Sequence, residues 1–176
     1  MNEYFINTEK LQKLCPRLNA GDRVILSGEV FTARDAAHKR IFESIEKGEG
    51  LPFSIDGSII YYAGPTPTPE GLAIGSCGPT TSARMDKYTP ALLSMGLVAT
   101  IGKGERNEEV RRAIKNNSSV YLCAIGGAGA IACKHIIKSQ VVAYEDLGCE
   151  SVKKLTFYKF PLIVGIDSNG NSIFDR

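Results

Sequence analysis

The chain has 176 residues, of which 43% are hydrophobic and 23% charged, and 21 basic residues against 19 acidic ones leave a net charge of +2. This composition is typical of an ordinary globular domain and excludes a disordered tail, a collagen-like repeat and a coiled coil. The small net charge does not favour a nucleic-acid or anionic-membrane partner, and no apolar run approaches the ~18 residues of a membrane helix.

Residues 1–20 form an N-terminal lead-in in which Leu11, Leu14 and Leu18 follow helical spacing. Polar and charged residues occupy the positions where a signal peptide would need an apolar stretch, so we expect a cytoplasmic protein. The apolar face of the lead-in is a candidate for contact with a partner protein. We expect residues 1–176 to form a single domain that includes this lead-in.

A strand and a helix are predicted after the lead-in. Residues 22–27 (DRVILS) form a β-branched run that is typical of a strand. Thr32 fits the N-cap of the next helix, with Asp35 at the acidic N3 position. Gly48 fits the C-terminal stop of this helix after Lys47.

The rest of the chain alternates between strand and helix patterns and then becomes rich in strands. Further strands are predicted at residues 59–63, 72–76, 97–101 and 120–125, and further helices at residues 80–95, 107–116 and 129–136. The proline-rich stretch GPTPTPEG forbids regular structure after the strand at 59–63. Beyond Gln140 the runs VVAY, KKLTFYKF and LIVGID predict strands. This order favours an α/β fold, a three-layer domain with mixed strand pairing.

The cysteines do not form a recognisable framework. Their number is odd and no pair has the CxxC spacing, so neither a disulfide set nor a zinc or iron–sulfur site held by this chain is predicted. Cys123 and Cys133 have apolar or small neighbours and are predicted to be buried thiols. The five cysteines are Cys15, Cys77, Cys123, Cys133 and Cys149.

The stretch GSCGPTTSARMD, residues 75–86, is the most informative part of the sequence. A predicted strand ends, a Gly-Pro turn follows, and the hydroxyls of Thr80, Thr81 and Ser82 arrive at a predicted helix start. Free N–H groups there favour an anion, and Arg84 could add a bidentate grip on a carboxylate. Alternatively, the hydroxyls only cap their own helix.

A second candidate lies in the stretch TARDAAH. Arg34 falls in the first turn of a predicted helix, where the helix dipole disfavours a cation, so an anionic ligand is indicated. Alternatively, Arg34 is a surface residue paired with Asp35 or Glu29. His38, one turn later, is either an acid/base group or a packed residue.

Two glycine-rich stretches follow predicted strands. Lys103 lies between Gly102 and Gly104 at a strand end, where ligands bind in α/β sheets, although it could equally be a solvated loop residue. Neither a nucleotide phosphate loop nor a complete dinucleotide loop is present, and a close strand–helix crossing explains the glycines at 126–129 better. The five candidates, cationic or hydroxylic, would suit a small dicarboxylate: Arg34, Thr80, Thr81, Arg84 and Lys103.

These residues lie in stretches that resemble a known family. GDRVILSGEVFTARDAAHKR, IIYYAGPTPTPEG, GSCGPTTSARMD, IGKGE, AIGGAGA and FPLIVGIDSNGN are similar to the β subunit of the class I iron–sulfur hydro-lyases. These are the two-subunit fumarases and L-tartrate dehydratases, and the same region forms the C-terminal domain of the single-chain enzymes. The resemblance covers residues 20–176, and its GPTTSxRMD and TARDxAH motifs are specific.

The resemblance implies a three-layer β/β/α "swivelling" domain with a mixed sheet. It also implies hydration of fumarate to (S)-malate, a step of the tricarboxylic acid cycle, or dehydration of L-tartrate to oxaloacetate. In the family, the [4Fe–4S] cluster is carried by the α subunit. The resemblance therefore implies that this chain contributes no metal ligands. A heterotetramer of two α and two β subunits is implied, and this chain would be inactive alone.

The same resemblance assigns roles to the five candidates. Arg34 and Arg84 would clamp the substrate carboxylates, and Lys103 would add a positive contact. Thr80 and Thr81 would be the catalytic residues, with Thr80 favoured for proton transfer and in need of activation by another group. Fumarate and L-tartrate enzymes are not separated by these residues. A stand-alone carboxylate-binding module and a purely structural role remain alternatives.

Overall fold

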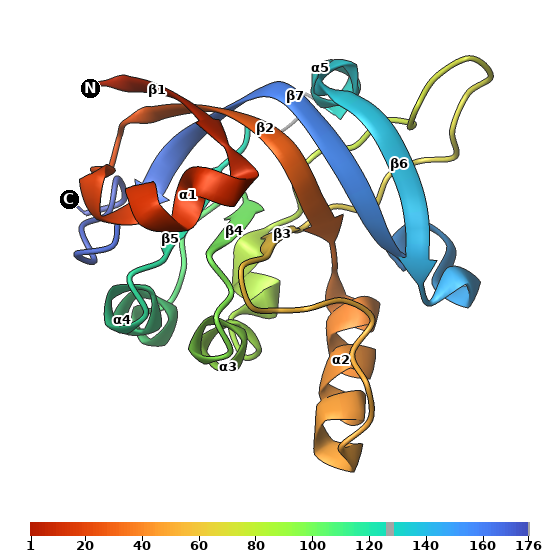
Figure 1. The fold of residues 1–176 in the computed structure, drawn as a ribbon, viewed down its shortest axis with the longest axis horizontal. Coiled ribbons are helices and arrows are strands. Elements are labelled where there is room, and N and C mark those ends of the chain that lie inside the picture. The colour runs from red at the N-terminus through yellow and green to blue at the C-terminus, as the bar shows by residue number, and fades with distance from the viewer. Residues whose placement is uncertain (126–128, 176) are drawn as a thin grey trace.

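The computed structural model describes residues 1–125 and 129–175, which form one mixed sheet with helices packed against it (Figure 1). The strands are β1 (Glu3–Asn7), β2 (Arg23–Thr32), β3 (Ile59–Tyr61), β4 (Ala99–Gly102), β5 (Val120–Cys123), β6 (Ile136–Ala143) and β7 (Val152–Ile166). The α-helices are α1 (Thr8–Leu14), α2 (Asp35–Lys47), α3 (Thr89–Ser94), α4 (Glu108–Asn116) and α5 (Gly129–Ala132). Short 3₁₀ turns are η1 (Cys15–Arg17), η2 (Ser82–Met85), η3 (Cys133–His135) and η4 (Glu145–Glu150).

The sheet has the order β1-β2-β3-β4-β5-β7-β6, and β7 also pairs with β2. This further pairing closes β2, β3, β4, β5 and β7 into a barrel-like sheet. Strands β1 to β5 are parallel to one another, whereas β7 is antiparallel to β2, β5 and β6. The carboxyl ends of β2, β3, β4 and β5 therefore meet at one edge of the sheet.

The alternation of side chains along β3 shows how the layers are built. Ile59 and Tyr61 belong to the core inside the closed sheet, while Ile60 and Tyr62, the residue directly after β3, belong to a second core between the sheet and the helices. β3 is therefore apolar on both faces, as expected of a strand covered on both sides. Figure 1 shows α2, α3 and α4 along the same side of the sheet. The predicted α/β fold, a three-layer β/β/α swivelling domain with a mixed sheet, is confirmed.

The prediction that the lead-in offers an apolar face to a partner is wrong. Residues 3–7 form β1, which pairs in parallel with β2, and α1 then turns back against the sheet. Leu11 and Leu18 are completely or almost completely buried in the inner core, and Leu14 packs against it. The helical spacing of these leucines therefore reflects burial against this chain's own sheet.

The helix predicted after the first strand is present, but its start differs. α2 begins at Asp35 with Arg34 as its N-cap residue. Thr32 is not the cap, because it ends β2: its buried hydroxyl donates to the Ser151 carbonyl (3.3 Å) and accepts from the Lys153 amide (3.0 Å). The predicted stop at Gly48 is confirmed, since Gly48 has the left-handed conformation (φ 67°) that glycine tolerates.

Two predicted elements between β3 and β4 are wrong. Residues 72–76 are not a strand, because Thr66 pairs with Ser76 through two hydrogen bonds (2.9 and 3.0 Å) and closes the loop on itself. Residues 80–95 do not form one helix but η2 and, separately, α3. The residues before η2 are extended and bridge to neighbouring strand ends, and Pro90 at the start of α3 is suited to a new helix start.

The cysteines are distributed differently from the prediction. Cys15 and Cys77 are buried, whereas Cys123 and Cys133, predicted to be buried, are only partly so. The glycine-rich loop at 126–128 lies outside the described residues. None of the described helices combines the length and the apolar character that crossing a membrane requires.

Candidate functional site at the carboxyl ends of β2, β3 and β4

The five candidate residues come together at the sheet edge where β2, β3 and β4 end. Arg34 follows β2 and Lys103 follows β4, and the segment that carries Thr80 and Thr81 lies between the extensions of β3 and β4. Arg84 in η2 reaches the first turn of α2, which follows β2. The edge at which parallel strands end is the usual place for a ligand in an α/β sheet.

Backbone hydrogen bonds hold the threonine pair in an extended segment. The Thr80 amide donates to the Tyr62 carbonyl (2.6 Å), and the Lys103 amide donates to the Thr80 carbonyl (3.3 Å). Thr81 forms a parallel bridge with Lys103. The predicted α-helix start is thus replaced by an extended segment between β3 and β4. Thr80 in this segment is half-buried and Thr81 is exposed.

The third hydroxyl, that of Ser82, anchors this extended segment to the sheet and does not face a ligand. Ser82 is completely buried, and its Oγ lies 2.9 Å from the Tyr121 hydroxyl. The Tyr121 hydroxyl donates to the Gly104 carbonyl (2.8 Å), so Ser82 is the donor in the first bond. A Cβ at Gly102 would lie only 2.0 Å from Ser82 Oγ, so this close approach requires glycine.

The two arginines share one carboxylate. Arg84 is half exposed and approaches Asp35 with two nitrogens: Nε donates to Oδ1 (3.0 Å) and Nη2 lies 2.8 Å from Oδ2. Arg34 Nε lies 3.9 Å from the same Oδ2 and 3.6 Å from Oε1 of Glu150. The expected pairing of Arg34 with Asp35 is therefore present in a loose form. Glu29, the other expected partner, contacts Lys154 instead (3.0 Å).

Arg34 is also positioned by its backbone and by a glycine. A Cβ at Gly64, just after β3, would lie 2.7 Å from Arg34 Nη1, so the guanidinium packs directly on the Gly64 backbone. The Arg34 carbonyl lies 2.8 Å from Nδ1 of His38 and accepts from the His38 amide at the same distance. Because a carbonyl only accepts, His38 carries its proton on Nδ1.

His38 is a packed residue rather than an acid/base group. Its ring is completely buried and lies against Tyr62 and Tyr88, with centroids 5.6 and 5.4 Å away. Burial lowers the pKa of His38 to about 4. The imidazole is therefore neutral near pH 7 and supports the backbone of Arg34.

A buried ion pair, which the sequence motifs did not indicate, lies next to the site. Arg106 Nε donates to Oδ1 of Asp86 (2.6 Å), and the two side chains are 0% and 7% exposed. The other guanidinium nitrogens of Arg106 donate to the hydroxyls of Thr100 (3.1 Å) and Thr89 (2.7 Å). Oδ2 of Asp86 accepts from the Asn107 amide (2.8 Å).

This pair ties the segment that contains the threonines to the loop that follows Lys103. Asp86 ends the motif GPTTSARMD, and Arg106 lies three residues beyond Lys103. Burial opposes the charge on Arg106, but Tyr62 and Asp86 more than offset this effect, so the pKa of the guanidinium is raised. Nothing in the local sequence around Asp86 or Arg106 signals a partner 20 residues away.

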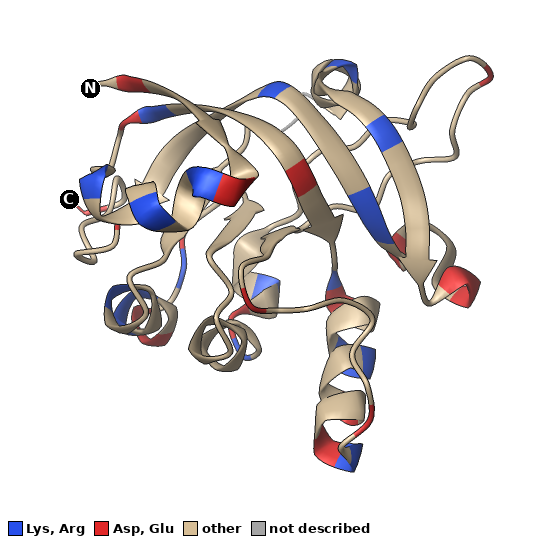
Figure 2. Cartoon of the chain, in the orientation of Figure 1, with Lys and Arg blue, Asp and Glu red and all other residues tan. Residues whose placement is uncertain are grey.

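Cationic side chains stand out at this edge although the chain as a whole has mixed charge. Figure 2 shows basic and acidic residues interspersed along the chain rather than collected on one face. Lys103 is half-buried, and no acidic side chain in the described residues forms an ion pair with it. The site thus offers three cations near two threonine hydroxyls, a set suited to carboxylates.

The donor groups in the described part of the chain do not fit a metal cluster. Within the described residues, no three His, Cys, Asp or Glu side chains lie close enough to hold a metal ion. Burial raises the pKa of both Cys15 and Cys77 to about 12, and only the thiolate form is a good metal ligand.

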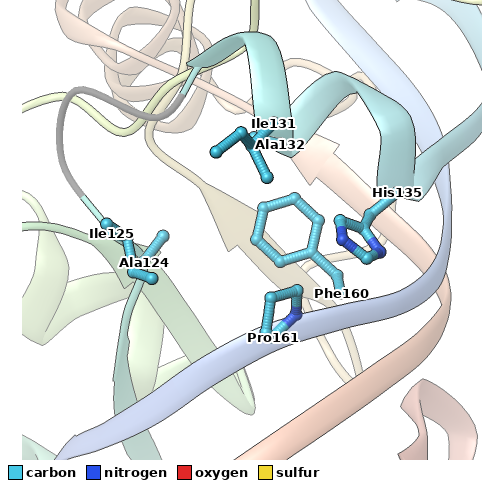
Figure 3. A pocket seen from close by; sticks show the side chains of 7 residues that line it. All are labelled: Ala124, Ile125, Ile131, Ala132, His135, Phe160 and Pro161. Atoms are coloured by element: carbon cyan, nitrogen blue, oxygen red, sulfur yellow. The ribbon is translucent and has the colours of Figure 1, made fainter.

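A separate apolar hollow lies beyond the end of β5 (Figure 3). Ile125 and Ile131, which face it, are largely exposed, and Phe160 and His135 close its other side. Its volume of about 30 Å³ is that of a single small group, and it offers few polar atoms. It is not suited to a dicarboxylate.

The fold and the site define an α/β domain that gathers cations and hydroxyls at one edge of a closed sheet. A comparison with protein families finds that the Fumarase C-terminus model matches residues 2–176, so the chain belongs to that family. The match includes β1 and α1, which precede all the stretches that carry the resemblance.

Individual relatives agree with this assignment. The chain is 41% identical over 170 residues to fumarate hydratase 2 of Leishmania major and 41% identical over 156 residues to the aerobic class I fumarate hydratase of Escherichia coli strain K12. These matches cover 96% and 88% of this chain but only 30% and 28% of the relatives, so the chain spans less than a third of their length. It is also 37% identical over 180 residues to a Methanocaldococcus jannaschii protein provisionally named L(+)-tartrate dehydratase subunit beta, covering 99% of this chain and 92% of that protein.

Proposed function

We propose that this chain is the β subunit of a class I iron–sulfur hydro-lyase that reversibly hydrates fumarate to (S)-malate. The observation that carries the proposal is the convergence of Arg34, Arg84 and Lys103 with two threonines at one sheet edge. A dicarboxylate needs cationic contacts at both ends, and we propose that these three cations provide them. The family match and the fumarate hydratase relatives support the reaction.

In this proposal the three cations bind and orient the substrate. Arg34 and Arg84 hold the carboxylates, and Lys103 adds a third positive contact. Arg84 has nitrogen atoms left over after its contact with Asp35, because the guanidinium carries five N–H donors. Binding both carboxylates holds the substrate in one orientation relative to the reacting groups. Such orientation is a large source of rate enhancement.

Thr80 is proposed to move the proton at the substrate carbon, with Thr81 as the second candidate. The half-buried position of Thr80 and its two backbone hydrogen bonds support this choice, because a proton-transfer group needs a fixed position. A threonine hydroxyl is a weak base, so a neighbouring group must activate it.

The remaining chemistry is proposed to come from an α subunit. A [4Fe–4S] cluster on that subunit, when bound, would polarise the substrate's hydroxyl and carboxylate. Cys15 and Cys77 are buried thiols whose pKa is raised to about 12, which suits them poorly as cluster ligands and supports placing the cluster on the partner. We further propose an assembly of two α and two β subunits in the cytoplasm, inactive when the α subunit is absent.

L-tartrate is the second candidate substrate. A protein provisionally named L(+)-tartrate dehydratase subunit beta is covered over 92% of its length by this chain, whereas fumarate hydratase 2 of Leishmania major is covered over 30%. That relative keeps dehydration of L-tartrate to oxaloacetate as an alternative. The substrates differ by a hydroxyl, which a polar contact from either subunit could discriminate.

The test is to purify the tagged chain from its native host without oxygen and to measure fumarate hydration and L-tartrate dehydration. We expect a co-purifying iron–sulfur polypeptide and turnover of fumarate above that of L-tartrate. If the complex prefers L-tartrate, the site assignment stands and the proposed substrate is wrong. A chain that purifies alone, without activity, and binds dicarboxylates by calorimetry would contradict the proposal and favour a binding module.

A further inference from the structure

We propose that Asp35 is a positioning residue that holds Arg84 in the orientation in which it receives a substrate carboxylate. This inference rests on the proposed function, because it concerns the same carboxylate site. The geometry points to Asp35 because one carboxylate lies between the two arginines, 2.8 Å from Nη2 of Arg84 and 3.9 Å from Nε of Arg34.

Arg84 needs such a partner. Its side chain is 51% exposed and lies on the short turn η2, so little packing restricts its rotamers. A free arginine side chain has many rotamers, and binding would have to overcome the loss of that freedom. Asp35 accepts a hydrogen bond from Nε at Oδ1, and its Oδ2 lies 2.8 Å from Nη2 as an ion pair without a further hydrogen bond, which restricts the guanidinium and leaves Nη1 unengaged by that carboxylate.

The position of Asp35 is itself well determined. It begins α2, and the adjacent amide of Ala36 donates to Glu150 (3.2 Å). The His38 ring anchors the carbonyl of Arg34, directly before Asp35. The carboxylate therefore projects from a rigid helix start, whereas the arginine it holds projects from a short turn.

Asp35 also lowers the electrostatic penalty of placing two guanidinium groups at one site. Arg34 and Arg84 repel each other, and a carboxylate near both offsets that repulsion. The opposite role for such a carboxylate is to compete with the substrate for Arg84. The two roles make opposite predictions, because a positioning residue lowers KM for the substrate and a competing one raises it.

The test uses the complete complex with its cluster-bearing subunit and compares Asp35→Asn with Glu109→Gln. Both variants remove one acidic charge from the first turn of a helix, but Glu109 is the second residue of α4 and lies on the groove beside α3. We expect Asp35→Asn to raise KM for fumarate about tenfold with kcat within about twofold of the wild type. Glu109→Gln should leave both constants unchanged.

Two further measurements make the inference specific to Arg84. In an Arg84→Ala background, Asp35→Asn should change KM by less than about twofold, because the residue through which Asp35 acts is gone. In the free chain, the ¹⁵N relaxation of the Arg84 Nε–H should report an ordered group in the wild type and a mobile one in Asp35→Asn.

An unchanged or lower KM in Asp35→Asn, or an equal increase of KM in the Arg84→Ala background, would overturn the inference. The failure of the proposed function would differ from this: the wild-type complex would not hydrate fumarate, or Arg84→Ala would match the wild type.

Discussion

The buried pair of Asp86 and Arg106 provides the sharpest stability prediction. Asp86→Asn keeps the shape of the side chain and removes its charge, so Arg106 remains a cation at 0% exposure with neutral hydrogen-bond partners only. Breaking a buried pair from one side costs about 3–5 kcal/mol, because the remaining charge is uncompensated. In a chain of this length each kcal/mol shifts Tm by about 2–4 °C, so Tm should fall by roughly 10 °C.

Urea unfolding followed by circular dichroism measures this free energy, with Asp146→Asn as the control. Asp146 pairs with Arg40 through two short contacts (2.7 and 2.5 Å) but on the surface, so its loss should have little effect. Adding Arg106→Met to Asp86→Asn should recover part of the lost stability, since the stranded charge is removed. A loss below about 1 kcal/mol for Asp86→Asn would refute the reasoning that Arg106 depends on this carboxylate.

Two other predictions concern the supports of the site. Because burial lowers the pKa of His38 from 6.5 to about 4, its contribution to stability should be complete above pH 6.5 and decline by about 3 kcal/mol as the pH falls to 4; a pH series of unfolding free energies checks this, and an equal decline in His38→Asn would contradict it. Gly102→Ala should destabilise the chain by about 1–3 kcal/mol and weaken carboxylate binding, because the new Cβ would displace Ser82 and with it Thr80; unfolding and substrate-binding measurements matching the wild type would show that the close approach is not required.

Much of the fold follows from local sequence. Local signals predicted the strand at 59–63, the helix stop at Gly48 and the helix at 107–116, and the structure contains β3, the left-handed Gly48 and α4 at these places. The helix predicted from Thr80 failed because pairing with strand ends outweighs helical propensity there. The burial of Leu11 likewise depends on a strand, β1, that the leucine spacing does not reveal.

For the candidate site too, one part could be predicted from the sequence and another could not. Motifs indicated the five residues that the structure gathers at one edge, although their roles stay predictions. The groups that hold them were not visible in the sequence, because they act across the fold. Asp86 and Arg106 are 20 residues apart, and Glu150 lies far along the chain from Arg34, which it contacts.

The central claim is that this sheet edge binds the substrate of a hydratase, and its most direct test is kcat/KM for fumarate in the anaerobically purified complex carrying Arg84→Ala. The control is Arg112→Ala, which removes an exposed arginine from α4. We predict that Arg84→Ala lowers kcat/KM at least about a hundredfold, as expected when a charged substrate contact is lost, while Arg112→Ala has no effect. Equal values for Arg84→Ala and the wild type would contradict the assignment of the site.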